Sequence, residues 1–194
     1  MDTMTTATAM TSEPRRVNGL DVDALAQVIE DVGNDPAKGM VRFRVTSGWR
    51  GQTRSEATVE SYMIGGEEVK RRFVMPVDEP LELLGENTAP NPQEMLMAAL
   101  NACVMVGYVA GAAVRGIRLD KVEIETTGEL DLRGFLGIAD DVAPGYESIQ
   151  YTVRIKGDGT PEQFREIHDT VIKTSPNYFN ISRPVRIDAD LVVE

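Results

Sequence analysis

The sequence predicts an α+β domain in which antiparallel strands surround one long, buried helix. First, residues 95–114 carry no charged side chain and are almost all apolar, Ala or Gly, and a helix that is apolar on every face must be covered. Second, several segments alternate apolar and polar residues, as residues 41–44 do (Val-Arg-Phe-Arg), which indicates half-buried strands. Third, the early strands are joined by connections too short for parallel crossovers.

Composition narrows the class of protein. A chain of 194 residues is long enough for one well-packed domain. The net charge of −11 argues against a surface for nucleic acid or anionic lipid. One cysteine excludes an intrachain disulfide and favours a reducing compartment. The first residues lack a basic start followed by an apolar run, so they do not resemble a secretory signal, and we expect a cytoplasmic protein.

The N-terminal part divides into two segments. Residues 1–17 are rich in Thr, Ala and Ser without an apolar period, which predicts a disordered tail. Residues 18–38 predict a short helix over 21–32, with Leu25, Val28 and Ile29 on one face, followed by a turn. The remaining residues, 39–194, are expected to form a single domain.

A three-stranded antiparallel meander opens this domain. The alternation predicts strands over residues 40–46, 54–64 and 69–75. Residues 47–51 predict the first turn, and Gly65-Gly66 predicts a hairpin between the second and third strands.

The central helix follows over residues 92–114. Asn91-Pro92 suits a helix start, and Arg115-Gly116 suits its end. Gly107 and Gly111 lie on one face and allow another element to approach closely. A membrane span of this length is the alternative. Its Ala and Gly content, Asn101 and the absence of flanking basic or aromatic clusters favour a buried helix in a soluble protein.

The second half predicts strands over 119–132 and 149–155, joined by a loop at 134–145. A second helix is expected over 160–173, capped by Thr160, with its inward residues Phe164, Ile167 and Val171. Ser175-Pro176-Asn177 ends this helix, and residues 185–193 alternate as a final strand.

Few residues point to chemistry. No Cys, His, Asp or Glu spacing is typical of a metal site, and no glycine-rich phosphate loop is present, so no metal or cofactor is expected. His168 is interpreted as a solvated helix residue. Cys103 is the one candidate nucleophile, although free cysteines are commonly buried apolar residues without reactivity.

Several short motifs together resemble those of the OsmC/Ohr family (osmotically inducible protein C and organic hydroperoxide resistance). The resemblance covers roughly residues 40–194 and rests on these pieces in this order: Leu84-Gly85, Asn91-Pro92, the Ala-rich helix with Cys103, Gly116-Ile117, residues 128–131, Ser175-Pro176 and Pro184-Val185. It implies an intertwined homodimer in which sheets from both subunits wrap two central helices. In peroxidase members, it also implies a reactive cysteine assisted by an arginine, a glutamate and a resolving cysteine.

The resemblance places these roles on particular residues. The reactive position falls on Cys103, and the arginine falls on Arg50, with Arg54 as the alternative. The glutamate position falls on Gln93, with Glu94 beside it, and the resolving position falls on Ser175. Two of the four roles are therefore substituted.

Two functional hypotheses follow. The first is a one-cysteine thiol peroxidase that reduces organic hydroperoxides and is regenerated by an external thiol. The second is a non-catalytic dimer of the same fold that binds a small apolar or acyl ligand near Cys103. Neither hypothesis involves nucleic acid or a membrane.

Overall fold

The computed structural model describes residues 15–194. The elements follow in the order β1 (Arg16–Val17), β2 (Leu20–Asp21), α1 (Val22–Asn34), η1 (Pro36–Gly39), β3 (Val41–Phe43), β4 (Thr46–Trp49), β5 (Ser55–Ile64), β6 (Glu67–Val77), η2 (Leu81–Leu83), α2 (Pro92–Val114), β7 (Leu119–Gly128), α3 (Leu132–Phe135), β8 (Ile149–Gly157), α4 (Pro161–Thr174) and α5 (Pro176–Ser182).

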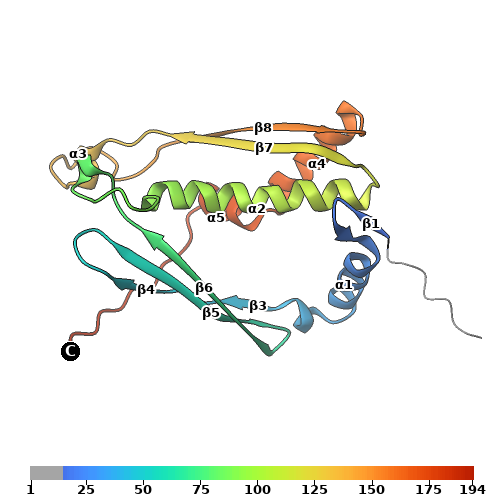
Figure 1. The fold of residues 1–194 in the computed structure, drawn as a ribbon, viewed down its shortest axis with the longest axis horizontal. Coiled ribbons are helices and arrows are strands. Elements are labelled where there is room, and N and C mark those ends of the chain that lie inside the picture. The colour runs from blue at the N-terminus through green and yellow to red at the C-terminus, as the bar shows by residue number, and fades with distance from the viewer. Residues whose placement is uncertain (1–14) are drawn as a thin grey trace, which may run out of the picture.

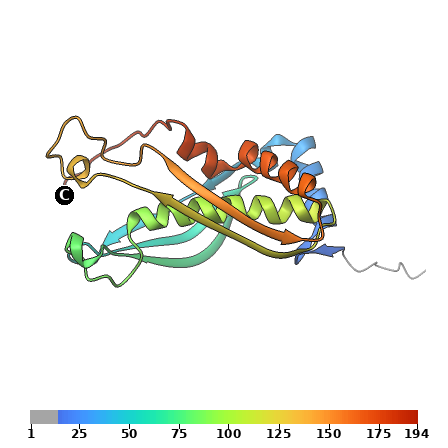
Figure 2. The same ribbon diagram turned by 90° about the horizontal axis from the view of Figure 1, so that it is seen from above.

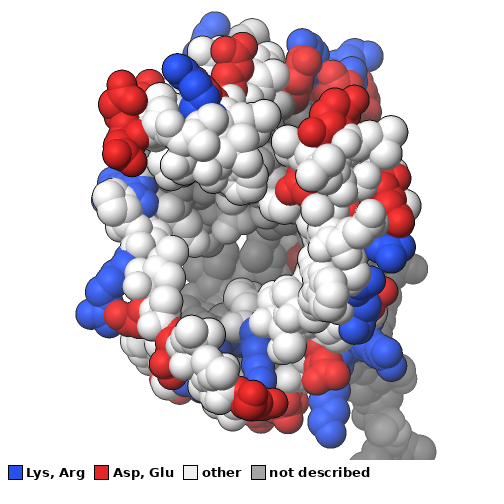
Figure 3. All heavy atoms as spheres, turned by 90° about the vertical axis from the view of Figure 1, so that its left-hand side faces the viewer, with Lys and Arg blue, Asp and Glu red and all other residues white. Residues whose placement is uncertain are grey.

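The long helix α2 runs through the middle of the molecule (Figure 1). The hairpin β7–β8 lies along one side of α2, and α4 and α5 lie along another (Figure 2). The sheet β3–β6 is set apart from α2, and α1 stands at one end of the space between them (Figure 1). Seen from the left-hand side of Figure 1, the molecule has a hollow in its middle that is bordered mainly by uncharged residues (Figure 3). The predicted α+β class is therefore confirmed, with antiparallel strands placed around a long helix.

The helix α2 begins and ends where the sequence predicts. Asn91 accepts a hydrogen bond from the Glu94 amide while the Glu94 carboxylate accepts one from the Asn91 amide, a capping box that satisfies two otherwise unpaired donors. By length and composition α2 could also cross a membrane, with a mean hydropathy of 1.8. Core helices of soluble proteins meet the same criterion, and here α2 packs against β7, α4 and α5.

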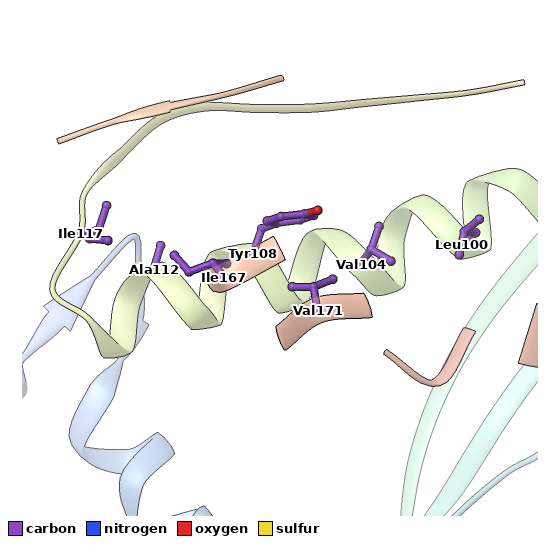
Figure 4. Close-up of a cluster of buried hydrophobic side chains, with 7 residues drawn as sticks. All are labelled: Leu100, Val104, Tyr108, Ala112, Ile117, Ile167 and Val171. Carbon is purple, nitrogen blue, oxygen red and sulfur yellow. The ribbon is translucent and has the colours of Figure 1, made fainter. Parts of the chain in front are cut away.

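The main core forms where α2 meets the hairpin and α4. Its side chains interlock along one stripe of α2 and are almost fully buried (Figure 4): Leu100, Val104, Tyr108, Ala112, Ile117, Ile167 and Val171. Burying a large apolar side chain contributes about 1.5–3 kcal/mol, so this cluster supplies much of the stability of the subunit. The predicted inward residues Ile167 and Val171 are confirmed.

Two glycines allow α4 to lie close to α2. A Cβ atom at Gly107 would come within 2.9 Å of a Val171 methyl carbon, and one at Gly111 would come within 3.1 Å of an Ile167 methyl carbon. The predicted close approach at these glycines is therefore made by α4 of the same chain.

The first sheet leaves one apolar face uncovered by the described residues. Both β3 and β4 pair with β5, and β6 pairs with the other edge of β5. Phe43 lies opposite Tyr62, which lies opposite Val69, so these three share a face. Trp49 on β4 is 75% exposed but lies on the opposite face, because its partner Ser55 is seven positions from Tyr62 along β5. On the shared face, Phe43 remains 69% exposed. A face of this kind usually meets a partner.

The N-terminal segment is fastened to the turn between α2 and β7. Asn18 adopts a left-handed conformation (φ 53°). Its side-chain amide donates to the Ile117 carbonyl and accepts from the Leu119 amide, both at 2.9 Å. The small hairpin β1–β2 was not predicted, and it includes residues 16–17 of the expected tail. The rest of that tail, residues 1–14, lies outside the described residues.

The structure differs from the prediction in four places. The predicted strand 40–46 is divided into β3 and β4, and the first turn spans residues 50–54 instead of 47–51. In that turn the Arg50 amide donates to the Arg54 carbonyl, the Arg54 amide donates to the Gly51 carbonyl, and Gly51 and Gln52 have positive φ. Strand β7 ends at Gly128 instead of 132, since Asp131 caps the short helix α3. Helix α4 ends before Ser175 as predicted, but Pro176 then starts a further helix, α5, that was not predicted.

The fourth difference concerns residues 185–193, which form no strand in the structure. The alternation is present, but no described strand lies beside this segment to accept its backbone bonds, and a strand is defined by such pairing. Ile187 and Leu191 are 84% and 83% exposed.

Candidate functional site

Cys103 and Ser175 meet where α2 contacts the junction of α4 and α5. Ser175 Oγ lies 3.3 Å from Cys103 Sγ. The same oxygen accepts a hydrogen bond from the Tyr178 amide at 3.3 Å, so its own proton is free to point toward the sulfur. Cys103 is half-buried, and Ser175 is only 6% exposed. The predicted reactive and resolving positions are thus neighbours.

The position of Ser175 is set by the two helices that it joins. Its amide donates to the Val171 carbonyl at 2.8 Å and closes the last turn of α4, while its hydroxyl caps α5. Asn177 then donates to the Ala99 carbonyl on α2 at 2.8 Å. These bonds hold the junction against the helix turn that carries Cys103.

The two candidate arginines are paired with carboxylates elsewhere. Arg50 Nε lies 2.8 Å from Glu56 Oε2, and Arg54 Nη1 lies 2.8 Å from Glu86 Oε2. Among the described residues, neither arginine makes a hydrogen bond to Cys103. The structure therefore does not bring the predicted arginine and cysteine together within one subunit.

Gln93 and Glu94 are also distant from Cys103. Gln93 precedes Cys103 by ten residues on the same helix, which separates them by about 15 Å along the axis. Glu94 is engaged in the capping box with Asn91. Both residues could approach a Cys103 thiol only if that thiol belonged to another subunit.

Asp78 is a buried carboxylate that sequence reasoning missed. It is fully buried and accepts hydrogen bonds from the Thr53 hydroxyl, the amides of Glu79, Glu86 and Thr88, and the Thr88 hydroxyl, at 2.8–3.2 Å. Burial alone would raise the pKa of Asp78, but these hydrogen bonds outweigh burial and hold it well below its usual range. Asp78 therefore fastens the loop before α2 to the β4–β5 turn.

The pKa of Glu79, next to Asp78, is shifted in the opposite direction. Burial, followed by the negative charges of Asp78 and Glu94, raises the pKa of Glu79. The start of α2 is thus an acidic region with one carboxylate that protonates more readily. Only an Asp-Glu pair before Pro80 hinted at this arrangement.

His168 was predicted to be a solvated residue, and this was wrong. Its Nδ1 lies 2.5 Å from the Tyr108 hydroxyl, and Tyr108 is almost completely buried. Burial first, and then the neighbouring Tyr151, raises the pKa of the Tyr108 phenol. The pair joins α2 to α4 across 60 positions of sequence, a distance at which no local pattern reveals a contact.

Metal ligands do not gather anywhere in residues 15–194: no group of three or more His, Cys, Asp or Glu side chains could hold an ion there. The contact between α2 and the α4–α5 junction brings one thiol beside one hydroxyl.

Comparisons with known proteins show that the chain is similar to OsmC-like proteins. The family model described as OsmC-like protein matches residues 85–190. An OsmC-like protein from Mycoplasma pneumoniae is similar in structure, with 18% identity, a TM-score of 0.56, and coverage of 73% of this chain and 87% of the other. A protein from Psychrobacter arcticus 273-4, named for osmotic stress induction and a detoxification response, has 15% identity, a TM-score of 0.52, and coverage of 70% and 85%. No curated protein sequence matches the chain.

Proposed function

Because the chain belongs to the OsmC-like protein family, we propose that it is a one-cysteine thiol peroxidase that reduces organic hydroperoxides. The observation that carries this proposal is the contact of 3.3 Å between Cys103 Sγ and Ser175 Oγ. A serine hydroxyl at this distance can donate to a thiolate and to the sulfenic oxygen that forms on it. Cys103 is not fully buried, as attack on a small reactant requires.

The first step is an oxygen transfer. The Cys103 thiolate attacks the terminal oxygen of the hydroperoxide, so that a sulfur–oxygen bond forms as the oxygen–oxygen bond breaks. The electron pair of that bond leaves with the alkoxide, which takes a proton from solvent and departs as the alcohol. Cys103 is left as the sulfenic acid.

The second step requires a thiol from another molecule. The chain has one cysteine, and Ser175 cannot form a disulfide with it. An external dithiol attacks the sulfenic sulfur and displaces the oxygen as water, and its second thiol then releases the Cys103 thiol as the dithiol becomes a disulfide.

A second copy of the chain is part of the proposal. Arg50 and Gln93 lie away from Cys103 of their own subunit, so the assisting groups would have to come from a partner. The uncovered sheet face with Phe43 and the unpaired segment 185–193 offer surfaces for that partner. The proposed assembly is an intertwined homodimer.

The test measures how fast the purified protein consumes cumene hydroperoxide when dihydrolipoamide is supplied as the reductant. We expect turnover by the wild type and loss of more than about 100-fold in rate for Cys103→Ser, because no other thiol exists to react. If the wild type consumes hydroperoxide and Cys103→Ser does so at a similar rate, the proposal is refuted.

Ligand binding without chemistry is the second candidate. It is favoured by a cavity of about 290 Å³ beside Leu100, one helical turn before Cys103, between α2, β8 and α5. A wild-type protein that does not consume hydroperoxide but shows saturable binding at this cavity would favour this second function.

A further inference from the structure

The cavity beside Leu100 has an unusual lining for an apolar or acyl ligand. Its walls include three tyrosines, Tyr146, Tyr151 and Tyr178, and its rim includes the carboxylate of Glu147. Tyrosine ring faces and carboxylates share one preference, since both attract positive charge. Within the described residues, neither lysine nor arginine lines this cavity.

Two of the rings are suitably arranged to face one ligand. The planes of Tyr151 and Tyr178 meet at 81°, and their centroids are 6.4 Å apart. Two rings at right angles at this spacing form a corner from which one cation can lie within about 6 Å of both centroids. Tyr146 adds a further wall, because Gly128 has no side chain and lets the tyrosine ring lie against the strand, where a Cβ atom would come within 2.9 Å of it.

The surroundings of the cavity strengthen the same preference. Glu147 and Ser148 also border a larger neighbouring cavity of about 1000 Å³, whose lining includes Glu129 and Asp141 and no basic residue. Asp131 lines it too, but its charge is balanced by an ion pair with Arg133. The whole chain carries a net charge of −11. This field attracts small cations and repels carboxylates, so an acyl ligand with a free carboxylate does not fit.

We propose that the cavity formed by Tyr146, Tyr151, Tyr178 and Glu147 binds a small alkylated ammonium cation. Apolar groups on the ligand would contact Leu100 and Ile181, which line the same cavity, while the charged centre faces the aromatic corner. Neither Cys103 nor Ser175 lines this cavity, so the proposal does not depend on peroxidase activity.

The test compares two probes of the same shape. Choline chloride and its neutral carbon isostere, 3,3-dimethylbutan-1-ol, are titrated into the wild-type protein at constant ionic strength. Methyl signals of Leu100, Ile149 and Ile181, which line the cavity, are followed by NMR. We expect saturable shifts at these methyl groups with choline and binding at least about tenfold weaker for the neutral probe.

Matched variants assign the effect to the cavity. Tyr146→Leu removes one ring face and is expected to weaken choline binding about tenfold, whereas Tyr146→Phe keeps the ring and stays near wild type. Glu147→Gln is expected to weaken binding about threefold. Glu60→Gln, the same charge change on the other sheet, serves as its control and is expected to leave binding unchanged.

Three outcomes would overturn the proposal. They are equal binding of the two probes, choline shifts that avoid the cavity methyl groups, and unchanged affinity in both Tyr146→Leu and Glu147→Gln. If Tyr146→Leu does not fold, the surface variant Glu147→Gln and the neutral probe still decide the question. Loss of hydroperoxide turnover in Cys103→Ser has no bearing on this result, so the two proposals fail separately.

Discussion

Ser175 Oγ lies 3.3 Å from Cys103 Sγ and bridges the sulfur to the first turn of α5. The contact joins two residues that are 72 positions apart in the sequence. It shows that the position at which the resemblance implied a second cysteine is occupied by a hydroxyl within reach of the first.

A cysteine in place of Ser175 is expected to form an intramolecular disulfide with Cys103. The present separation is that of atoms in contact, and a small side-chain rotation brings two sulfurs into bonding range. One equivalent of cumene hydroperoxide added to Ser175→Cys should therefore remove both thiols, measured by thiol titration and by a loss of two hydrogens in the intact mass.

Thr174→Cys is the matched control for that experiment. The Thr174 hydroxyl donates to the Thr170 carbonyl on the exposed side of α4, so a cysteine at position 174 should remain reduced within the monomer. A disulfide in both variants, or in neither, would contradict the geometry described for the junction.

Asp78→Asn is expected to lower stability, because an amide cannot accept all five hydrogen bonds made to the carboxylate. We expect the midpoint of thermal unfolding at pH 7 to fall by about 5 °C or more, measured by calorimetry. Asp140→Asn, in the exposed loop between β7 and β8, should leave it unchanged.

The effect of Asp78 should also depend on pH. Folding lowers the pKa of Asp78, so its stabilisation is complete above the pKa of an unfolded aspartate, about 3.9, and is lost as the pH falls toward the lower folded value. The stability difference between wild type and Asp78→Asn should therefore shrink below about pH 4. A difference that stays constant down to pH 2 would show that the carboxylate charge is not the cause.

The segment 185–193 is expected to be buried against a second copy of the chain. Ile187 and Leu191 are 84% and 83% exposed in the single subunit, so Ile187→Lys with Leu191→Lys should have little effect on a monomer. In the proposed dimer these lysines would be buried without partners, and sedimentation velocity should show a shift toward monomer.

Asp190→Asn, which leaves the apolar side chains of the same segment in place, is the control and should remain dimeric. A wild-type protein that sediments as a monomer at all concentrations, or a double variant that keeps the dimer, would rule out this role for the C-terminal segment.

Local patterns predicted most of the fold. The uncharged run of residues 95–114 with its cap at Asn91 determined the position of α2, since burial and capping depend on neighbours along the chain. The pairing of β5 with β6 followed from alternation and the Gly65-Gly66 turn. The final strand was wrong for a physical reason: alternation states which face is apolar, but a strand also needs an edge to pair with.

By itself, the sequence determined the fold class, the central helix, the single thiol and the OsmC-like resemblance, because each depends on residue type and short-range order. Tertiary structure alone decided that Ser175 touches Cys103, that Arg50 pairs with Glu56, and that Asp78 is buried under five hydrogen bonds. The Arg50–Glu56, Thr53–Asp78 and Cys103–Ser175 contacts join residues that are 6, 25 and 72 positions apart. Their distances depend on how the helices and strands pack, and local sequence carries no record of that packing.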